Sequence, residues 1–381
     1  MKKVNWQNSR LKEIADYVDY RGKTPCKSKS GKQLITARNI KEGYIDYNIS
    51  KEYVNESEYD KIMSRGLPGL GDILITTEAP MGNVAQVDNV NIALAQRVIK
   101  YRCKENTILN DYLKYYLMSD IFKRQLKLES TGGTVKGIKG SRLHNIHVFY
   151  PEIDVQKGIV DILKVFDIYI EKTERLIRAK EEYKKGLMQK LLSGNLRFNG
   201  KWKNEQIKKI ARIKKGEQLN RLKLSDKDEY PALNGGIMPS GFTNKWNTEG
   251  HTITISEGGN SCGFINFMTT KFWSGGHCYS LLDVKINTLF LYYALKHREK
   301  QIMRLRVGSG LPNIQKTDIE DFLVPIPDSI EEQNRIAEML SLIDKEINLL
   351  KQKAELLKLQ KKGLMQQLLT GKLRVKTKGE K

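Results

Sequence analysis

The sequence is poor in cysteine, and its four cysteines lie far apart. Cys26, Cys103, Cys262 and Cys278 show no C-x-x-C spacing. Zinc clusters and disulfide scaffolds need closely spaced cysteines, so neither is expected, whereas scattered free thiols suit a reducing cytoplasm. No apolar run approaches the ~18 residues of a membrane span, and residues 1–5 lack the apolar core of a signal peptide. We therefore expect a cytoplasmic protein that makes no membrane contact.

Acidic residues are also few. The 381 residues include 66 Lys and Arg but only 44 Asp and Glu, which gives a formal net charge of +22. An excess of this size is typical of proteins that bind a polyanion, most often nucleic acid. The alternative is a lysine-rich protein whose charged helix faces meet only solvent. The length suffices for two or three domains with cores of their own.

Recognisable catalytic motifs are lacking. Gly22-Lys23-Thr24 resembles the end of a P-loop, but Tyr17 occupies a position where that motif needs glycine. His144 and His147 are three residues apart, with no third metal ligand near them in the sequence. Pro327-Asp328 lacks the downstream E-x-K of a nuclease core, and no Asp/Asn-Pro-Pro-aromatic run of an amino-methyltransferase is present. We therefore predict a binding protein with no catalytic residue, metal site or cofactor of its own.

The pattern that organises the chain is a long helix predicted from Ser329 to about Leu369. Its apolar residues recur in alternating steps of four and three, interrupted only by Lys361. No proline or glycine interrupts this segment before Gly363. This is the a/d pattern of a helix that packs along another helix. About 40 residues at ~1.5 Å rise per residue give a rod roughly 60 Å long. The seam positions are Ile336, Leu340, Ile343, Ile347, Leu350, Ala354, Leu357, Leu364 and Leu368.

An internal repeat supplies the partner helix. Lys184–Gln189 recurs as Lys361–Gln366, and Leu191–Arg197 is matched by Leu368–Arg374, both at an offset of 177 residues. A constant offset over this length indicates a duplication. The first copy carries the same apolar seam, with polar residues at Thr173, Lys180 and Lys184. We predict two antiparallel helices related by a pseudo-two-fold axis.

The antiparallel arrangement also predicts neighbouring chain ends. Leu196 and Arg197 lead into the region of Trp202, which corresponds to Trp6 in the first half of the chain. By the same geometry, Leu373–Val375 should lie close to Met1–Trp6.

Two globular regions alternate with the helices. The first should contain short strands around Leu34–Ile40 and Gly71–Thr76 and a helix over Asn110–Leu128. The second repeats this order, with Gly250–Ser256 in the place of Gly71–Thr77 and a helix over Leu289–Met303. The predicted fold class is α+β: two pseudo-repeated mixed α/β domains, residues 1–150 and 198–326, separated by two long antiparallel helices in a coiled coil, residues 151–197 and 327–381.

Basic residues gather in corresponding loops of the two globular regions. Arg and Lys neutralise phosphates, and Arg or Asn can bind guanine or adenine edges through two hydrogen bonds. Glycine loops before each long helix, around Gly132 and Gly308, would let backbone N–H groups approach phosphates, although such glycines also serve as turn residues. We predict DNA contacts from Arg21, Lys23, Lys27, Lys32, Arg38, Asn39, Lys136, Lys139, Arg142, Arg212, Lys214, Lys215, Arg221, Lys223, Arg304, Arg306 and Lys316.

A glycine inside each helix repeat has a separate interpretation. Glycine costs about 1 kcal/mol against alanine in a helix, so its presence in both copies suggests close approach of another backbone. The alternative is simple inheritance from a common ancestor. We predict a docking face for a partner protein at Gly186, Leu187, Met188, Gly363, Leu364 and Met365.

Taken together, these features resemble the specificity (S) subunit of type I restriction-modification enzymes. The resemblance covers essentially the whole chain and rests on the repeated segments Lys184–Arg197 and Lys361–Arg374, the Pro151 and Pro327 helix starts, the Gly71–Leu74 strand and the glycine loops. It implies that each globular region is a target recognition domain for one half of a split sequence in double-stranded DNA. It also implies that the helices set the distance between the half-sites.

The resemblance further implies partners and their cofactors. Two methyltransferase subunits that use S-adenosylmethionine would dock on the helices, and two motor-nuclease subunits that use ATP and Mg²⁺ could join them. Two other function classes stay open: a self-contained DNA methyltransferase or nuclease, and a scaffold with no role on DNA. The sequence does not reveal the bases that are read, the spacer length or whether the complex also cuts DNA.

Overall fold

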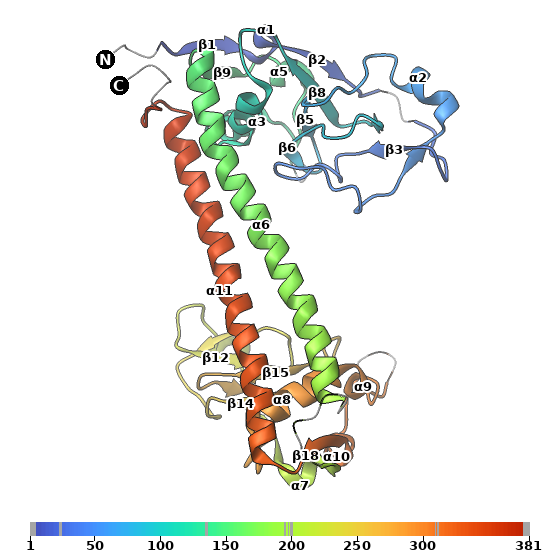
Figure 1. The fold of residues 1–381 in the computed structure, drawn as a ribbon, viewed down its shortest axis with the longest axis vertical. Helices are drawn as coiled ribbons and strands as arrows, with labels where there is room; N and C mark the ends of the chain where they lie inside the picture. The colour runs from blue at the N-terminus through green and yellow to red at the C-terminus, as the bar shows by residue number, and fades with distance from the viewer. Residues whose placement is uncertain are drawn as a thin grey trace. The chain divides into compact units, whose positions relative to one another are not determined.

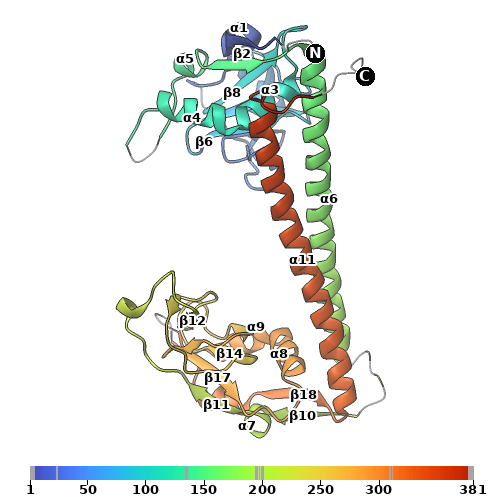
Figure 2. The ribbon, with the colours of Figure 1, turned by 90° about the vertical axis from the view of Figure 1, so that its left-hand side faces the viewer.

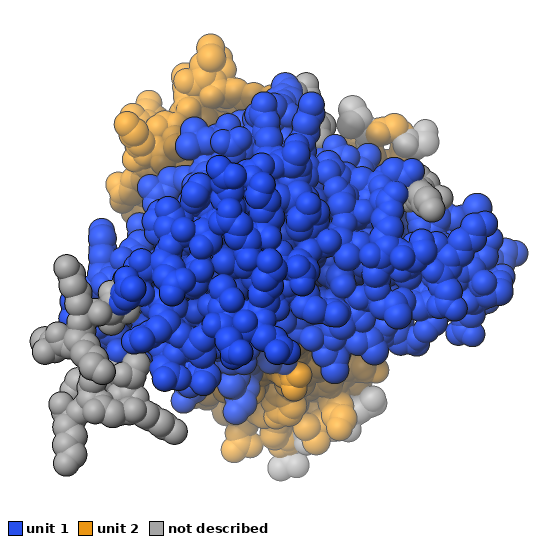
Figure 3. Space-filling model, turned by 90° about the horizontal axis from the view of Figure 1, so that it is seen from above, with its two compact units in different colours: residues 1–172, 353–381 blue, residues 173–352 orange. Residues whose placement is uncertain are grey.

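The structure is a computed structural model that describes residues 5–22, 25–133, 136–193, 196, 198, 201–308, 310 and 312–375. It divides into two compact units, shown in Figure 3. Unit 1 comprises Met1–Lys172 and Lys353–Lys381, and unit 2 comprises Thr173–Gln352. Each unit therefore combines one globular region with a part of both long helices.

Unit 1 contains three small sheets and several short helices before the first long helix (Figure 1). Its elements are β1 (Gln7–Arg10), α1 (Leu11–Ile14), β2 (Ala15–Asp19), β3 (Lys32–Ile35), β4 (Tyr53–Val54), the 3-10 helix η1 (Glu56–Glu58), α2 (Tyr59–Ile62), β5 (Ile73–Thr77), β6 (Met81–Gln86), β7 (Ile92–Leu94), β8 (Val98–Cys103), α3 (Asn110–Met118), α4 (Asp120–Glu129), α5 (Gly140–Leu143), β9 (His147–Tyr150) and α6 (Ile153–Leu192).

Unit 2 repeats the order of the strands and of the later helices, but its 3-10 helix precedes its three-stranded sheet and, within the described residues 201–308, no helix stands in the place of α2. Its elements are β10 (Trp202–Gln206), α7 (Ile207–Ile210), β11 (Arg212–Lys215), the 3-10 helix η2 (Arg221–Lys223), β12 (Tyr230–Leu233), β13 (Gly241–Thr243), β14 (Thr252–Ser256), β15 (Ile265–Met268), β16 (Trp273–Ser274), β17 (Cys278–Leu282), α8 (Thr288–His297), α9 (Glu299–Met303), α10 (Lys316–Asp321), β18 (Leu323–Pro327) and α11 (Ile330–Leu368).

The strand order shows that the two globular regions share one topology. The four-stranded sheets are β2-β8-β5-β6 and β11-β17-β14-β15, the three-stranded sheets are β4-β3-β7 and β13-β12-β16, and the pairs are β1-β9 and β10-β18. In each three-stranded sheet one pairing is parallel, between β3 and β7 or between β12 and β16. The predicted α+β duplication is confirmed.

The strand register corrects the predicted alignment of the two copies by one residue. Ile73 pairs with Tyr101, and Ile253 pairs with Leu281. Ile138 donates its N–H to Thr77 O (3.0 Å), while Ile314 donates to Glu257 O (2.9 Å). Thr77 therefore corresponds to Glu257 rather than to Ser256. A one-residue shift moves every side chain of a strand to the opposite face, so the alignment of the two copies could be decided only from the strand pairing in the structure.

Both predicted globular helices are broken in the structure. The segment Asn110–Leu128 forms α3 and α4, which are separated at Ser119, and Leu289–Met303 falls on α8 and α9. Ser119 is in an extended conformation, and its Oγ accepts a hydrogen bond from Phe122 N at 3.3 Å. Serine in this position satisfies a free N–H at a helix start. The apolar residues keep their helical spacing on both sides of Ser119, so the sequence pattern did not reveal that a second helix begins there.

The core of each unit is completed by both long helices. In unit 1, Ile159 and Leu163 of α6 lie in one apolar cluster with Leu368 and Leu369 of α11. In unit 2, the corresponding cluster joins Leu191 and Leu192 of α6 to Ile336, Ala337 and Leu340 of α11. Each globular region thus packs against the start of its own helix and the end of the other.

The helix segments are antiparallel within each unit and lie side by side in both views (Figures 1 and 2). In unit 2, Glu181 pairs with Lys351 at 2.7 Å and Lys184 pairs with Asp344 at 2.5 Å. Residue numbers thus rise along α6 in the direction in which they fall along α11. In unit 1, Lys361 pairs with Asp167 at 2.5 Å. The lysines that interrupt the apolar seam therefore have acidic partners on the facing helix.

A glutamine at the equivalent position of each copy fixes the start of each long helix. Gln156 Oε1 accepts from Leu109 N (2.8 Å) and its Nε2 donates to Pro151 O (2.8 Å). Gln333 Oε1 accepts from Asn287 N (3.0 Å) and its Nε2 donates to Pro327 O (2.9 Å). Both amides are buried. Because a buried polar group must be paired, these contacts hold each helix start against the loop that precedes α3 or α8.

The end of α11 closes against the start of the chain, as the repeat predicts. Gly371 has a positive φ of 71°, the left-handed conformation that suits a glycine after a helix. An added Cβ there would lie 2.8 Å from Nε1 of Trp6, and one at Gly158 would lie 2.5 Å from Val375. The two ends of the described chain are therefore neighbours in unit 1.

Two glycines in α11 and its cap give a first prediction. We expect Gly371→Ala to lower the free energy of unfolding by about 1–2 kcal/mol, because alanine disfavours a left-handed φ and its Cβ meets Trp6. The matched control is Gly363→Ala, where an added Cβ has no atom within 4 Å and alanine favours the helix by about 1 kcal/mol. Urea unfolding of both variants measures the difference, and equal stability of the two would contradict the cap.

Candidate nucleic-acid interface

A glycine loop folds over the end of the central sheet in both units. In unit 1, the loop that contains Gly132 forms bridges from Thr131 to Gly137 and from Glu78 to Gly137. In unit 2, Val307 and Gly258 bridge to Asn313 in the same way. The loops therefore lie beside the ends of β5 and β14, and the side chains at these two places form the strongest candidate sites.

In unit 1 the loop region carries a network of arginines. Arg21 Nε donates to both carboxylate oxygens of Asp19 (2.9 and 2.8 Å). Arg65 Nη1 donates to the backbone oxygens of Asp19 (2.8 Å) and Arg21 (2.5 Å). The guanidinium of Arg21 also lies against Gly140, the residue after Lys139. Burial alone would raise the pKa of Asp19, but the hydrogen bonds from Arg21 lower it below its usual value.

An exposed aromatic ring borders this network. Tyr17 is 45% exposed and stacks on His144 with 3.6 Å between the ring centroids. The buried hydroxyl of Tyr101 lies 2.6 Å from His144 Nδ1. Burial raises the pKa of Tyr101, so this hydroxyl keeps its proton and can donate a hydrogen bond to the ring nitrogen. The network holds the Tyr17 ring rigidly at the surface, and such a ring can stack on a base or sugar.

In unit 2 the corresponding place has different chemistry. Glu257 accepts hydrogen bonds from Lys215 Nζ and from Tyr279 Oη (3.1 Å), and its second oxygen lies 3.3 Å from His277 Nδ1. Burial alone would raise the pKa of Glu257, but the hydrogen bonds from Lys215 and Tyr279 lower it. Cys262 donates its thiol to Glu257 O at 3.0 Å, and Arg306 is close enough to counteract the rise that burial causes in the Cys262 pKa.

The strand pairing shows that the two networks occupy equivalent positions. Asp19 lies opposite Ile99, whereas Lys215 lies opposite Tyr279, and Ile99 and Tyr279 are each two residues before the matched residues Tyr101 and Leu281. The same position is therefore acidic in unit 1 and basic in unit 2. One scaffold with opposite charges at one place can distinguish two different ligands.

The structure brings some predicted residues together and keeps others apart. Arg21 lies against Gly140, the chain neighbour of Lys139, in unit 1, and Lys215 and Arg306 both approach the Glu257 region in unit 2. Lys27 pairs with Glu52 (3.1 Å), and Lys32 donates to Asn91 (2.8 Å) at the separate three-stranded sheet. The other predicted residues with an acidic partner are Arg212 with Asp283 (2.6 Å), Lys214 with Glu217 (3.5 Å) and Lys316 with Glu320 (3.3 Å).

Eight predicted residues are exposed and form no ion pair within the parts of the chain that the structure describes. They are Arg38, Lys136, Lys139, Arg142, Arg221, Lys223, Arg304 and Arg306. Such side chains are free to reach phosphates or base edges. Lys23, which was also predicted, lies outside the described residues. Arg97 pairs with Glu78, which bridges to Gly137, at 2.8 Å. Arg65, Arg97 and Tyr17 were not predicted, because isolated side chains in a sequence give no sign of the distant residues that they approach.

Asn39 is a correction to the predicted site. Its side chain is fully buried. Its Oδ1 accepts from Thr36 N (3.0 Å) and Thr36 Oγ1 (2.9 Å), and its Nδ2 donates to Asp46 O (2.9 Å) and Ser50 O (3.1 Å). All its bonding groups are used within the turn, so Asn39 stabilises the loop that displays Arg38 and does not present an amide to DNA.

The predicted partner-docking residues also have mixed surroundings. Gly186 and Gly363 face open space, since an added Cβ at either would have no atom within 4 Å. Met365 is buried in the core of unit 1, and Leu187 and Met188 pack partly into the core of unit 2. The two glycines therefore stay available to a partner, whereas Met365 is occupied by its own chain.

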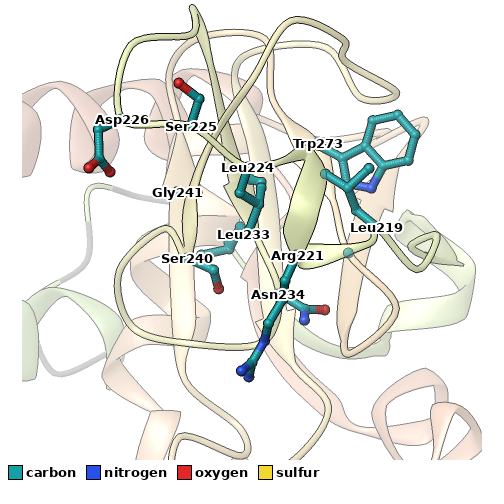
Figure 4. A pocket seen from close by; sticks show the side chains of 12 residues that line it. Leu219, Arg221, Leu224, Ser225, Asp226, Leu233, Asn234, Ser240, Gly241 and Trp273 are labelled. Carbon is teal, nitrogen blue, oxygen red and sulfur yellow. The ribbon is translucent and has the colours of Figure 1, made fainter.

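A cavity of roughly 470 Å³ lies beside η2 and the three-stranded sheet of unit 2. Figure 4 shows Leu224 and Leu233 near its centre, with the side chains of Arg221 and Trp273 projecting in different directions. Trp273 Nε1 donates to Glu217 O at 2.8 Å, which fixes the indole as a wall. The cavity therefore places Arg221 at the rim of a partly apolar hollow.

Neither metal nor membrane features emerge from the described residues. No group of three His, Cys, Asp or Glu side chains among them could hold a metal ion. Likewise, none of the helices traced in the structure is long and apolar enough to cross a membrane.

Comparison with protein families shows to which family the chain belongs. A family model described as the type I restriction modification DNA specificity domain matches residues 3–180 and again residues 199–359. The chain belongs to this family. The two matches coincide with the two copies of the fold, so each unit carries one specificity domain.

Several relatives of the specificity domains are type I specificity subunits by name. A putative subunit from Mycoplasma pneumoniae is 37% identical over 152 residues, which cover 39% of this chain and 40% of the relative. A putative MjaX specificity subunit from Methanocaldococcus jannaschii is 27% identical over 418 residues, which cover 98% and 95%. The match thus spans well under half of the first relative and nearly all of the second.

Solved structures support the fold of the specificity domains and helices. The S subunit of a type I restriction-modification system from M. genitalium superposes with a TM-score of 0.67 at 20% identity and covers 97% of both chains. A chain from a structure titled for complex assembly and conformational transition of the type I R-M system gives a TM-score of 0.57 at 17% identity, with 98% and 100% coverage. At these identities the two matches support the overall fold of the chain.

The buried histidine of the first specificity domain gives a prediction about pH. Burial lowers the pKa of His144 to about 4, whereas an unfolded chain titrates near 6.5. Between these values only the unfolded state takes up a proton, so the free energy of unfolding falls as the pH decreases. We expect a loss of about 2 kcal/mol between pH 7.5 and 5.0, at ~1.4 kcal/mol per pKa unit.

Urea unfolding at the two pH values tests this origin of the pH dependence. His144→Gln should be less stable at pH 7.5 but should lose most of the pH dependence, because glutamine does not titrate. His147→Gln, which replaces an exposed ring, serves as the control and should keep it. An unchanged pH dependence in His144→Gln would contradict the assignment.

Proposed function

We propose that this chain is the DNA-recognition subunit of a type I restriction-modification complex. Each specificity domain reads one half of a split target in double-stranded DNA. The observation that carries the proposal is the duplicated fold, in which equivalent strand positions hold Asp19 with Arg21 in one copy and Lys215 with Glu257 in the other. One docking geometry combined with two chemistries suits two half-sites of different sequence.

The net charge and the free cations support binding to DNA. A formal charge of +22 favours a polyanion, and eight predicted cationic side chains carry no acidic partner among the described residues. Phosphate contacts position a protein, while contacts to base edges specify the sequence. We assign positioning to the lysines of the glycine loops, and base reading to Arg38 and Arg221, which lie at the three-stranded sheets.

We propose recognition domains over residues 1–150 and 198–326, with helical connectors over 151–197 and 327–381. The helices would act as the spacer between half-sites. They would also dock two methyltransferase subunits, and Gly186 and Gly363 are the exposed positions of the predicted docking face.

Catalysis is assigned to the partners. Methyltransferase subunits would bind S-adenosylmethionine, motor-nuclease subunits would use ATP and Mg²⁺, and the complex would act in the cytoplasm. Support comes from the relatives, which are named as specificity subunits, and from the neighbour whose title names the assembly of a type I R-M system. The rival function is a DNA methyltransferase or nuclease that works alone.

The proposal predicts that methylation requires partners. The purified chain, incubated with labelled S-adenosylmethionine and DNA, should transfer no methyl groups, and addition of its methyltransferase subunits should start transfer to a split target. Sequencing that detects methylated adenine would read the target and its spacer. Turnover by the chain alone would favour the rival, and methylation without any split target would contradict two-domain recognition.

Single arginines give a second prediction about the half-sites. We expect Arg38→Ala to relax preference in one half-site and Arg221→Ala to relax it in the other, each by a factor on the order of 10 to 100, as for the loss of a base contact. Lys157→Ala, at the exposed start of α6, is the control. Binding to targets with single base changes measures the effect, and equal losses in both halves would contradict independent reading.

A further inference from the structure

The apolar seam between α6 and α11 contains one lysine in each unit whose side chain is at most 19% exposed, and both lysines make the same set of contacts. We propose that these lysines, with one aspartate and one tyrosine each, are positioning residues that fix the stagger of the helices and thereby the spacer length of the DNA target. This inference rests on the proposed function, since it concerns the spacing that the helices would set.

The first cluster lies in unit 1. Lys361 of α11 donates from Nζ to Asp167 Oδ1 of α6 at 2.5 Å, and only 11% of its side chain is exposed. Tyr115 of α3 donates its hydroxyl to the other oxygen of Asp167 at 2.6 Å. The ammonium group also lies 5.0 Å from the centre of the Tyr115 ring. Asp167 thus joins both helices to a helix of the globular domain.

The second cluster repeats these contacts in unit 2. Lys184 of α6 donates to Asp344 Oδ1 of α11 at 2.5 Å, with 19% of its side chain exposed. Tyr293 of α8 donates to the second oxygen of Asp344 at 2.8 Å, and its ring centre lies 5.3 Å from the ammonium group. Lys184 corresponds to Lys361 and Asp344 to Asp167 at the same offset of 177 residues, so the helices exchange these roles between the units.

A polar pair in an apolar seam acts mainly on alignment. Each pair joins a largely buried ammonium group to a carboxylate that is 41% exposed in Asp167 and 32% exposed in Asp344. The cost of removing the lysine from water offsets much of the attraction, so the complete pair contributes little to stability. A single polar residue at a seam position instead selects one register, because every other register leaves it without a partner. Here each aspartate also accepts from a tyrosine, so the alignment of the helices is tied to the position of α3 or α8.

The alternative registers show how selective the pairs are. Sliding the antiparallel helices by one heptad in one direction would place Lys361 opposite Val160 and Lys184 opposite Ala337, which buries both charges without partners. Sliding them in the other direction would place Lys361 opposite Glu174 but Lys184 opposite Lys351. Neither shifted register satisfies both lysines, so only the observed stagger is compatible with both clusters.

A shift of the helices by one heptad is large compared with the rise per base pair of DNA. One heptad is ~10.5 Å of helix at ~1.5 Å per residue, which equals about three base pairs at ~3.4 Å each. A register error of one heptad would therefore move one recognition domain by about three base pairs along the target. Without the lysines the apolar seam alone would tolerate such shifts, since leucine-rich seams repeat every seven residues.

The test uses the full chain with its methyltransferase subunits and a set of targets whose half-sites are separated by different numbers of base pairs. The double variant Lys184→Met, Lys361→Met makes the seam continuously apolar. Asp167 and Asp344 lose their cation in this variant, but their side chains are 41% and 32% exposed and stay solvated. We therefore expect a modest loss of thermal stability, while its preference for the native spacer over spacers three base pairs longer or shorter falls at least tenfold. A merely structural role would instead lower binding to all spacers equally.

Two controls separate the possible causes. Lys351→Met with Lys358→Met removes two lysines of α11 that are about half exposed, and it should leave the spacer preference intact. Exchanging the partners, Lys361→Asp with Asp167→Lys, should retain selectivity that Lys361→Asp alone loses, which keeps the test informative if the methionine variant does not fold. Unchanged spacer preference in the double methionine variant would overturn the inference. A wild-type complex with no preferred spacer would overturn the proposed function instead.

Discussion

Neither globular domain possesses a complete core without the end of the other domain's helix. Leu368 and Leu369 fill the core of unit 1, and Leu191 and Leu192 fill that of unit 2. Because these side chains can be buried only if the helices run antiparallel, packing of the cores and pairing of the helices are one event. The order of the chain, with each domain followed by its helix, follows from this exchange.

The same exchange explains why polar residues persist in an apolar seam. Lys184 and Lys361 lie where each helix passes the other domain, and there an aspartate and a tyrosine receive them. Hydrophobic burial along the seam supplies the driving force for association, but its seven-residue repeat does not by itself select one register. The buried charges contribute the alignment that the leucines do not. Stability and geometry are thus provided by different residues of one interface.

The duplicated frame also separates structure from recognition. The central sheets, the glutamine caps and the glycine-loop bridges agree between the units, whereas the side chains above them differ in charge. Arg21 with Asp19 lies beside Gly140 in one domain, and Lys215 with Glu257 and His277 occupies the equivalent place in the other. Such a frame can change its ligand without changing its fold, because loop side chains contribute little to the cores.

The sequence by itself determined the duplication, the long helices and their antiparallel pairing, since a constant offset and a seven-residue period are visible without coordinates. It also indicated that Arg21 and Lys139, far apart in the chain, belong to one kind of surface. Only the tertiary structure decided that Asn39 is buried, that Arg65 and Tyr17 border the loop, that Ser119 divides a helix and that Thr77 matches Glu257. The physical reason is that sequence periodicity shows only which face of a helix or strand is apolar. The position and contacts of a polar side chain depend on hydrogen-bond partners that lie far away in the sequence.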